Sequence, residues 1–466
     1  MRKLIATQED AAVLFAKNVV NIRYKDIPKE VVENTKNSVL DTLGILIGAS
    51  GITPELKNLV ELIREWGGKK ESTIIGFGGK VPAPMAAFAN GAMGHCLDYD
   101  DFHDAQIHTG SPILCAGFAI AEHLGKVEGK DFITALALGH DFGCRLALAA
   151  NQWRQDWHKT TLFGGFSATA TCGKLLKLDV QKMVAAFGIA LTEAAGTEEI
   201  RYGVGHTMGG MRDAYPARAG VFSSLMAERG LTGPRNSLEG KAGLFNTHFR
   251  GEYDREVLLS DLGKRFEGIN VGYKLWPSCS TTHIYIGATL SLVIDNNINP
   301  KDIKQIIAHG GDYAKRLFEP LEERRRPITT LDAKFSIPFC VACAASKQRV
   351  GLADFTPDAI KDKKVLELAD KVTLKYDKTL NLKQQSEPPG VVEILTIDGK
   401  RYSKRVDIVL GDPRNPISRE VMIEKFRECA EYSVKPLTKE RVKKVIDYAL
   451  QLEQVEDVGK IIRLLG

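Results

Sequence analysis

Residues 166–173 read FSATATCG, a stretch in which Phe166 is the only large side chain. Small side chains let neighbouring helices approach closely, so such a run is typical of a helix inside a helical bundle. Apolar and small residues recur at helical spacing on both sides of it. The segments with this pattern are 11–20, 31–47, 112–124, 132–150, 167–176 and 185–195. They predict a large, all-helical N-terminal domain.

The rest of the chain has a different pattern. With 466 residues the chain is too long for one ordinary hydrophobic core. From residue 268 onward, short β-branched runs alternate with helical patterns, which predicts a smaller α+β domain. The β-branched runs are 303–308, 371–376, 391–397 and 404–410, and the helical patterns are 281–296 and 335–347. Asp398-Gly399 predicts a hairpin turn.

Helical patterns return after the segment GDPRNP at 411–416, over 419–430 and 439–452. We therefore expect a mainly α protein with two domains. The helical domain is predicted to comprise residues 1–267 plus 412–466, and the α+β domain residues 268–411.

Composition excludes several classes of protein. The formal net charge is +5, from 63 basic and 58 acidic residues, which slightly favours small anions and does not indicate nucleic-acid binding. We expect no membrane interaction, because no apolar stretch approaches the roughly 20 residues of a membrane span. The eight cysteines lie apart in apolar contexts, as expected for reduced thiols in a cytoplasmic protein. Cys340 and Cys343 are expected to be helix core.

The segment LDYDDFHD at 97–104, followed by His108, is the densest group of titratable residues. A buried charge costs several kcal/mol unless it is paired, so this segment is poor core material. Clusters whose members shift one another's pKa values are what acid–base catalysis requires. The alternative is a solvated loop that caps a helix beginning near Ser111-Pro112.

Two further segments place a basic residue near the start of a helix. His158 precedes a glycine-rich helix start, where unpaired backbone donors would keep the ring neutral and able to act as a base. Arg212 precedes the helical pattern 217–227 and could bind a carboxylate. The alternatives are a surface histidine beside Trp157 and a surface pair of Arg212 with Asp213.

Residues 273–283, YKLWPSCSTTH, carry hydrogen-bonding side chains into the start of another helix. Lys274, Cys279 and His283 are the candidates here for substrate binding. Cys279 could also be a nucleophile, although nothing in the spacing implies a covalent mechanism. Lys334 begins a further helical pattern and could hold an anion. Several basic or titratable groups at helix N-termini are expected for a polycarboxylate pocket.

In these motifs the chain resembles the MmgE/PrpD family, almost from end to end. The matching segments are 40–44 (LDTLG), 89–92 (ANGA), 97–101 (LDYDD), 157–158 (WH), 274–283, 333–336 (AKFS) and 411–413 (GDP). The resemblance implies a large helical domain formed by the N-terminal part and the C-terminal tail, plus a smaller α+β domain. It also implies an active site between the two domains and a homodimer.

The resemblance also assigns residues. Asp98 corresponds to the active-site aspartate of the family's D-[YF]-D-D motif, and His108 and His158 correspond to its two histidines. The chain departs from the family at four positions. Phe102 replaces a usual threonine, Asp156 a glycine and Gly209 a lysine, and Cys279 stands where the decarboxylase pattern has a further histidine. The last two departures argue against decarboxylation, although Arg212 lies near the position of the missing lysine.

These observations predict a cofactor-independent acid–base lyase that acts on a small di- or tricarboxylate, with no metal ion. His158 or His108 would move a proton next to a carboxylate, and Asp98 would assist. Cations such as Arg212 and Lys274 would hold the substrate, together with Lys334. A hydro-lyase resembling 2-methylcitrate dehydratase is the leading prediction, and the second imidazole would protonate the departing hydroxyl.

The sequence is also compatible with three other functions. One is an epimerase, isomerase or decarboxylase acting on a related polycarboxylate. Another is a metal-dependent hydrolase whose ligands would be Asp98, Asp100, Asp101 and His103. A third is a binding protein that kept the fold without catalysis.

Overall fold

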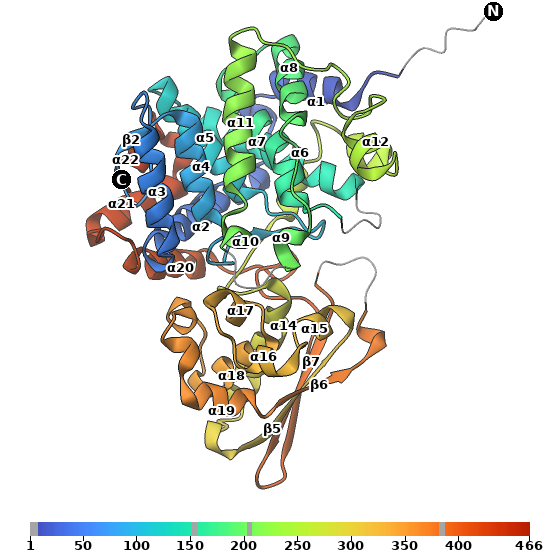
Figure 1. Ribbon diagram of the computed structural model, residues 1–466, viewed down its shortest axis with the longest axis vertical. Helices are drawn as coiled ribbons and strands as arrows, with labels where there is room; N and C mark the ends of the chain where they lie inside the picture. Colours follow the sequence, from blue (N-terminus) through green and yellow to red (C-terminus); the bar gives the residue numbers. More distant parts are fainter. Residues whose placement is uncertain (1–7, 151–155, 203–206, 382–386) are drawn as a thin grey trace, which may run out of the picture.

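The computed structural model describes residues 8–150, 156–202, 207–381 and 387–466. Figure 1 shows two parts stacked along the long axis of the molecule. The upper part is helical and the lower part combines helices with a sheet. The C-terminal helices, drawn in red, return to the upper part and lie beside its blue N-terminal helices. The predicted mainly α fold with a smaller α+β domain is confirmed.

The stretch at 166–173 lies in α7 (Lys159–Leu175), in the middle of the helical domain. α7 packs against α5 (Gly110–Leu124), α6 (Gly129–Ala149) and α11 (Ala214–Glu228). A Cβ atom added to Gly220 of α11 would lie 2.3 Å from the Cβ of Ala168. The two helices therefore touch at a point where only the smallest side chains fit, as the sequence predicted.

The other helices of this domain surround these four. They are α1 (Ala11–Asn21), α2 (Lys29–Ile52), α3 (Glu55–Trp66), α4 (Ala83–Gly94), α8 (Val180–Leu191), α9 (Glu199–Tyr202), α10 (Met208–Met211), α12 (Leu244–Phe249), α13 (Arg255–Leu259), α20 (Arg419–Glu431), α21 (Lys439–Leu450) and α22 (Gly459–Arg463). α8 ends at Leu191, earlier than the predicted residue 195, and the chain then turns at Gly196, which has φ 116°. The Gly196 carbonyl accepts a hydrogen bond from the backbone N–H of His158, so this turn helps to position a candidate site residue.

Within the described ranges, α6 is the only single helix whose length and composition would let it cross a membrane. However, 94% of its apolar window is buried inside the molecule, where it packs against α7. α2 and α3 pass the same test only as a pair, and the chain bends by 96° between them. α6 is therefore the core helix of a bundle.

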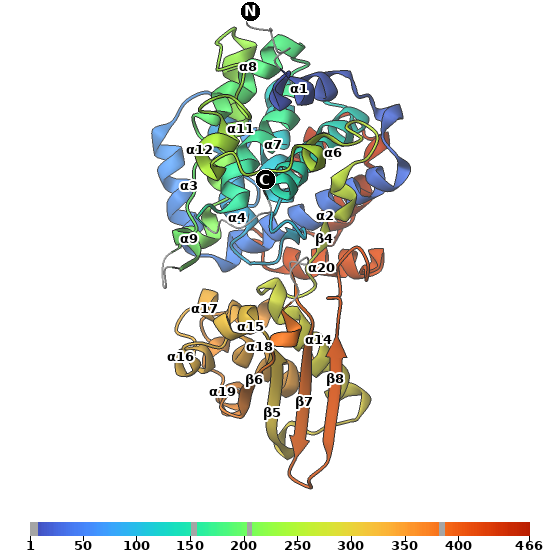
Figure 2. The ribbon, with the colours of Figure 1, turned by 90° about the vertical axis from the view of Figure 1, so that its right-hand side faces the viewer.

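The smaller domain contains a four-stranded sheet, drawn in Figure 2 with its helices beside it. Its strands are β5 (Ile303–Gly310), β6 (Val372–Tyr376), β7 (Gly390–Thr396) and β8 (Arg401–Val406). The order is β6-β5-β7-β8, with β5 and β6 parallel and the other pairs antiparallel. α14 (Ser280–Asp295) packs against β7, β8 and α18 (Ile337–Lys347), and α18 packs against α19 (Lys363–Ala369). Short helices α15 (Asp312–Arg316), α16 (Leu321–Arg325) and α17 (Thr330–Lys334) complete the domain.

The hairpin between β7 and β8 turns at Gly399, which has φ 89° as predicted for that turn. The last strand begins earlier than the predicted residue 404, because pairing starts directly after the turn with Arg401 opposite Leu395. Cys340 and Cys343 are free, buried thiols within α18, so the prediction of helix core is confirmed.

The two parts have separate hydrophobic cores. One core includes residues up to Tyr273 and again from Met422 onward, and the other lies mainly between Trp276 and Val409. We propose the division into 1–267 plus 412–466 and 268–411. The cores support two such parts, although Val271 and Tyr273 pack with the helical part.

Short strands join the parts. β3 (Asp101–Phe102) pairs with β4 (Gly272–Tyr273), and Phe102 packs in the core of the smaller domain. The titratable segment is therefore held by both domains. A separate two-stranded ribbon, β1 (Ser72–Thr73) with β2 (Lys80–Val81), lies on the helical domain.

Candidate active site

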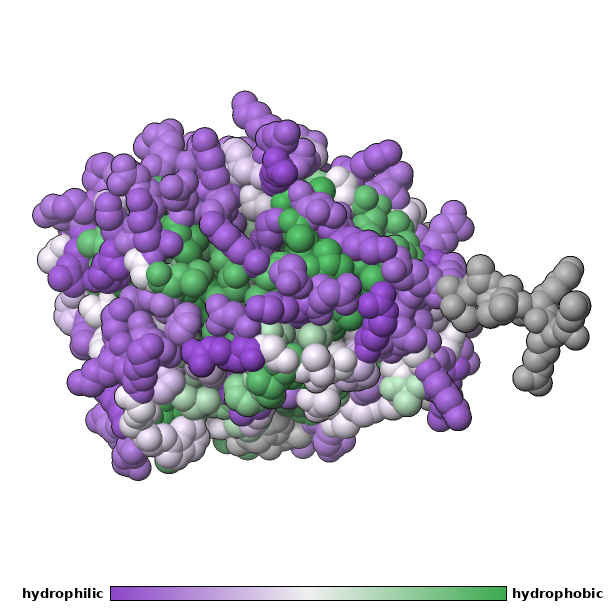
Figure 3. Space-filling view, turned by 90° about the horizontal axis from the view of Figure 1, so that it is seen from above, coloured by the Kyte–Doolittle hydropathy of each residue, from purple (hydrophilic) through white to green (hydrophobic). Residues whose placement is uncertain are grey.

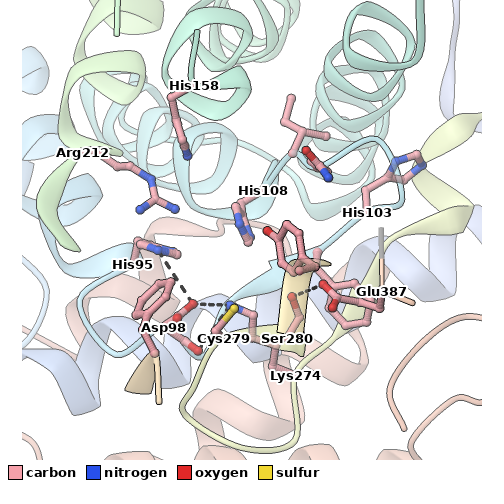
Figure 4. Close-up of a pocket in the computed structure, with 15 residues that line it drawn as sticks. His95, Asp98, His103, His108, His158, Arg212, Lys274, Cys279, Ser280 and Glu387 are labelled. Carbon is pink, nitrogen blue, oxygen red and sulfur yellow. Dashed lines mark hydrogen bonds and ion pairs between the residues drawn. The ribbon is translucent and has the colours of Figure 1, made fainter. Parts of the chain in front are cut away.

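A pocket lies where the two domains meet, and titratable side chains of both domains line it (Figure 4). The lining residues from the helical domain include His95, Asp98, His103, His108, His158 and Arg212. Those from the smaller domain include Lys274, Cys279, Ser280 and Glu387. Asp98, Asp100, Asp101 and His103 are each at most 3% exposed. The alternative prediction is therefore wrong about solvation, although Asp101 does cap the start of α5.

Asp98 and Lys274 form a buried ion pair across the domain junction. The Nζ of Lys274 lies 2.5 Å from Oδ1 of Asp98 and 3.3 Å from Oδ1 of Asp100. Burial opposes the charge of Asp98, but the ammonium of Lys274 and the nearby ring of His95 together outweigh it and lower the pKa of Asp98 to about 2. Among the described residues, Oδ2 of Asp98 has no hydrogen-bond partner. Asp98 is thus a fixed negative charge whose Oδ2 can accept a hydrogen bond.

His108 is held in one tautomer. Its Nδ1 lies 2.5 Å from the backbone carbonyl oxygen of Asp101 and 3.2 Å from Oδ2 of Asp100. A carbonyl oxygen only accepts, so Nδ1 carries the hydrogen and Nε2 keeps a lone pair. Burial lowers the pKa of His108 to about 3, although Asp100 opposes this. The ring is therefore neutral near pH 7 and can accept a proton at Nε2.

His95 belongs to the same group, although the sequence analysis did not single it out. Its Nδ1 lies 2.8 Å from Oδ2 of Asp100, and its Nε2 lies 3.8 Å from Oδ1 of Asp98. The centroids of the His95 and His108 rings are 5.1 Å apart. The signal in the sequence was its position three residues before Asp98. In the structure His95 is the C-cap of α4, whereas His108 lies just before the start of α5.

His158 and Arg212 enter the pocket from the helical domain (Figure 4). His158 is the N-cap of α7, and its Nδ1 accepts a hydrogen bond from the backbone N–H of Thr161. Arg212 lies at the turn between α10 and α11, where its Nη1 donates to the Gly209 carbonyl at 2.7 Å. Both side chains are buried, so the alternative predictions of a surface histidine and a surface ion pair are wrong.

The structure separates the three remaining candidates. Cys279 lines the pocket at the start of α14, but burial raises the pKa of its thiol to about 12, so no thiolate is present near pH 7. His283 and Lys334 are not among the lining residues. Nε2 of His283 donates to the Trp276 carbonyl, and Nζ of Lys334 donates to the Cys96 carbonyl at 2.9 Å. These hydrogen bonds turn both side chains toward the backbone behind the pocket.

Glu387 was not predicted, because it stands alone in a polar segment with no motif around it. Its carboxyl group accepts hydrogen bonds from the hydroxyls of Ser280 and Thr281 at the start of α14. Desolvation raises the pKa of Glu387 to about 7 despite these bonds. Near neutral pH the group is therefore partly protonated and can donate a proton.

Two of the four metal ligands predicted for a hydrolase, Asp101 and His103, are engaged by the local backbone. Oδ2 of Asp101 accepts from the backbone N–H groups of Thr109 and Gly110 at the start of α5, and Nδ1 of His103 accepts from the N–H of Ala105. Burial, and then the charge of Asp100, raise the pKa of Asp101 to about 8. The role of Asp101 is thus to hold the start of α5 through these hydrogen bonds.

Lys425, on α20, binds the backbone of the titratable segment 97–104. Its Nζ donates to Oδ1 of Asp41 at 2.6 Å, to the Tyr99 carbonyl at 2.7 Å and to the Lys274 carbonyl at 2.8 Å. It also lies 3.8 Å from the centroid of the Tyr99 ring. One ammonium group thereby joins α2, the titratable segment and the segment that carries Lys274.

Comparisons with known proteins agree with this architecture. The pattern of the MmgE/PrpD N-terminal domain matches residues 13–256, and that of the MmgE/PrpD C-terminal domain matches residues 276–452. Among curated proteins, the chain is 27% identical to a cis-aconitate decarboxylase of Aspergillus terreus over 96% of this chain and 94% of that protein. It is 27% identical to the cis-aconitate decarboxylase of Homo sapiens over 97% and 93%. A cis-aconitate decarboxylase-like protein of Aspergillus oryzae is 28% identical over 96% and 95%.

Proposed function

The chain belongs to the MmgE/PrpD family, and from this premise we propose that it is a lyase that removes a proton next to a carboxylate of a small di- or tricarboxylate. The observation that carries the proposal is the partly buried, neutral ring of His108, whose Nδ1 is committed to a backbone carbonyl. Its Nε2 can act as the base beside the cations of Lys274 and Arg212 in the same pocket.

The charges suit the chemistry of such a step. A proton next to a carboxylate is weakly acidic, so the site must stabilise the enolate-like charge that develops when it leaves. Arg212 offers planar donors for a substrate carboxylate, and Lys274 adds a second cation next to Asp98. The spare Oδ2 of Asp98 would accept a hydrogen bond from the substrate. His158, at the other end of the pocket, would orient the substrate or share the proton.

We favour a hydro-lyase, of the kind represented by 2-methylcitrate dehydratase. Such a reaction needs an acid that protonates the departing hydroxyl, as well as a base. Glu387 supplies a partly protonated carboxyl group in the same pocket as His108. Cys279 and Gly209, which stand in place of a family histidine and lysine, give no support to decarboxylation.

Decarboxylation of cis-aconitate is the second candidate, because the curated relatives that match nearly the whole chain bear that name. An epimerase would use the same proton abstraction, and it would return the proton to the other face of the carbon.

The proposal is tested by incubating the protein in D₂O with hydroxy, unsaturated and amino di- and tricarboxylates. We expect deuterium to enter the carbon next to a carboxylate of one class, by NMR, and an absorbance from a new conjugated double bond. Release of CO₂ from cis-aconitate would instead favour the second candidate. Absence of deuterium exchange in every compound would overturn both candidate reactions and would favour a binding protein without catalysis.

Glu387→Gln should remove one limb of the pH profile. In the unaltered protein we expect kcat to be flat below about pH 6 and to fall as pH rises through about 7, because Glu387 then loses the proton that it donates. The variant has no such proton, so its kcat should be lower and should not fall through that range. Glu393→Gln, in the sheet of the smaller domain, is the control. A fall near pH 7 that persists in Glu387→Gln would assign the limb to another group.

We also propose a cytoplasmic homodimer. All eight cysteines are buried free thiols, as in proteins of reducing compartments. Figure 3 shows an apolar area on the end of the helical domain that lies opposite the smaller domain. Phe222, within α11, and Leu231, just after it, are each nearly half exposed, and such side chains are typical of interfaces. Light scattering of the purified protein would give the number of subunits.

A further inference from the structure

One group of side chains in the pocket has the donor set of a metal site. His95, Asp100 and His108 each offer a ligand atom, and these atoms lie within 4.8 Å of one another. The Nδ1 atoms of His95 and His108 lie 2.8 Å and 3.2 Å from the same Oδ2 of Asp100. With metal–ligand bonds of about 2.0–2.1 Å, adjacent ligand atoms around one ion lie about 3 Å apart. The three atoms are therefore spaced for one ion without a large movement.

The surroundings of the group also suit a cation. Asp100 turns its other oxygen, Oδ1, to the Nζ of Lys274 at 3.3 Å, and ligating carboxylates in metal sites are commonly hydrogen-bonded in this way. Asp98 adds a second buried carboxylate 3.8 Å from Nε2 of His95. Within 4 Å of these side chains, two carboxylates and one ammonium sum to one negative charge, and the guanidinium of Arg212 lies in the same pocket.

We propose that His95, Asp100 and His108 bind one divalent transition-metal ion, with Zn²⁺ as its probe, and that this ion inhibits the acid–base reaction. Two imidazoles and one carboxylate are ligands that Zn²⁺ accepts. The first half of the proposal, binding, is independent of the reaction. The second half, inhibition, rests on the proposed function.

The mechanism of inhibition follows from the tautomer of His108. In the metal-free arrangement Nδ1 carries the hydrogen and donates it to the Asp101 carbonyl. A metal ion on Nδ1 moves that hydrogen to Nε2, which then cannot accept a proton from the substrate. His95 and His108 line the pocket, whereas Asp100 does not, so the ion would lie at the pocket wall with Asp100 on its far side. Because it deprives Nε2 of His108 of its free lone pair, Zn²⁺ should lower kcat.

The binding test is titration of the chelator-treated protein with Zn²⁺ by calorimetry. We expect one ion per chain, and an affinity lower by about tenfold or more in Asp100→Asn and in His95→Gln. Asp98→Asn is the matched control, because it removes a neighbouring negative charge without removing a ligand, and it should weaken binding much less. Equal weakening by Asp98→Asn and Asp100→Asn, or the absence of a bound ion, would overturn the site.

A second measurement needs no variant. X-ray absorption of the Zn²⁺-loaded, unaltered protein should show scattering from two imidazole rings, and one ring or none would overturn the assignment. For inhibition, deuterium exchange is measured with and without Zn²⁺. Exchange that occurs at full rate with the ion bound would overturn the inhibitory role alone. Protein that exchanges no substrate even without metal would refute the proposed function and leave the binding result standing.

Discussion

His108→Gln should lower turnover by about 10²–10⁴-fold, the usual contribution of one group in general acid–base catalysis. Glutamine keeps a donor that can reach the Asp101 carbonyl, but its amide cannot take a proton near pH 7. The ring of His108 is little exposed and is not part of a hydrophobic core cluster, so the fold should persist. Deuterium exchange and turnover of the substrate found by the screen measure the effect, and circular dichroism checks the fold.

The control for this variant is His123→Gln. His123 lies at the end of α5, outside the pocket, beside Glu71, and its loss should leave turnover unchanged. His158→Gln separates the two candidate bases. If His108→Gln retains full activity while His158→Gln loses it, the assignment of the base to His108 is wrong and His158 takes its place.

Lys425→Met should destabilise the protein by about 3–5 kcal/mol, the cost of removing one partner of a buried ion pair. Both Lys425 and Asp41 are buried, and methionine fills the space of the stem without its charge. Asp41 would be left without its cation, and two backbone carbonyls would lose their donor. Burial already raises the pKa of Asp41, so in the variant this carboxyl should take up a proton. Urea denaturation followed by circular dichroism measures the loss.

Two further variants show whether the buried pair is the cause. Asp41→Asn added to Lys425→Met should recover part of the stability, because the unpaired charge is gone. Lys443→Met breaks an exposed ion pair with Asp447 on α21 and should cost no more than about 1 kcal/mol. Equal destabilisation by Lys443→Met and Lys425→Met would contradict the role given to the buried pair.

Much of the fold followed from the sequence, because it depends on local patterns. Small residues at helical spacing predicted the bundle, and the contact of Gly220 with Ala168 shows why they are small. Asp398-Gly399 predicted the hairpin for an equally local reason, since the turn needs a residue with positive φ. Element ends were less predictable. They depend on distant partners, as at Gly196, which turns to meet His158.

The site was predictable only where a motif marked it. Asp98, His108 and Lys274 lie together as the sequence indicated, although nothing local showed that Asp98 and Lys274 would form an ion pair across the domain junction. Glu387 reaches the pocket through tertiary contacts alone. His283 is on the predicted helix, but a hydrogen bond to its own loop turns it away. Helical periodicity places a residue on an element and does not choose its partner.

Lys425 comes late in the chain. It belongs to α20 (Arg419–Glu431), yet its ammonium joins Asp41, near the beginning of the protein, to the segment that carries Lys274. On the ribosome, the first helices and the whole sheet are made before this clamp exists. A nascent chain should therefore stay inactive until α20 has emerged. Early termination anywhere before α20 would yield no partly working enzyme.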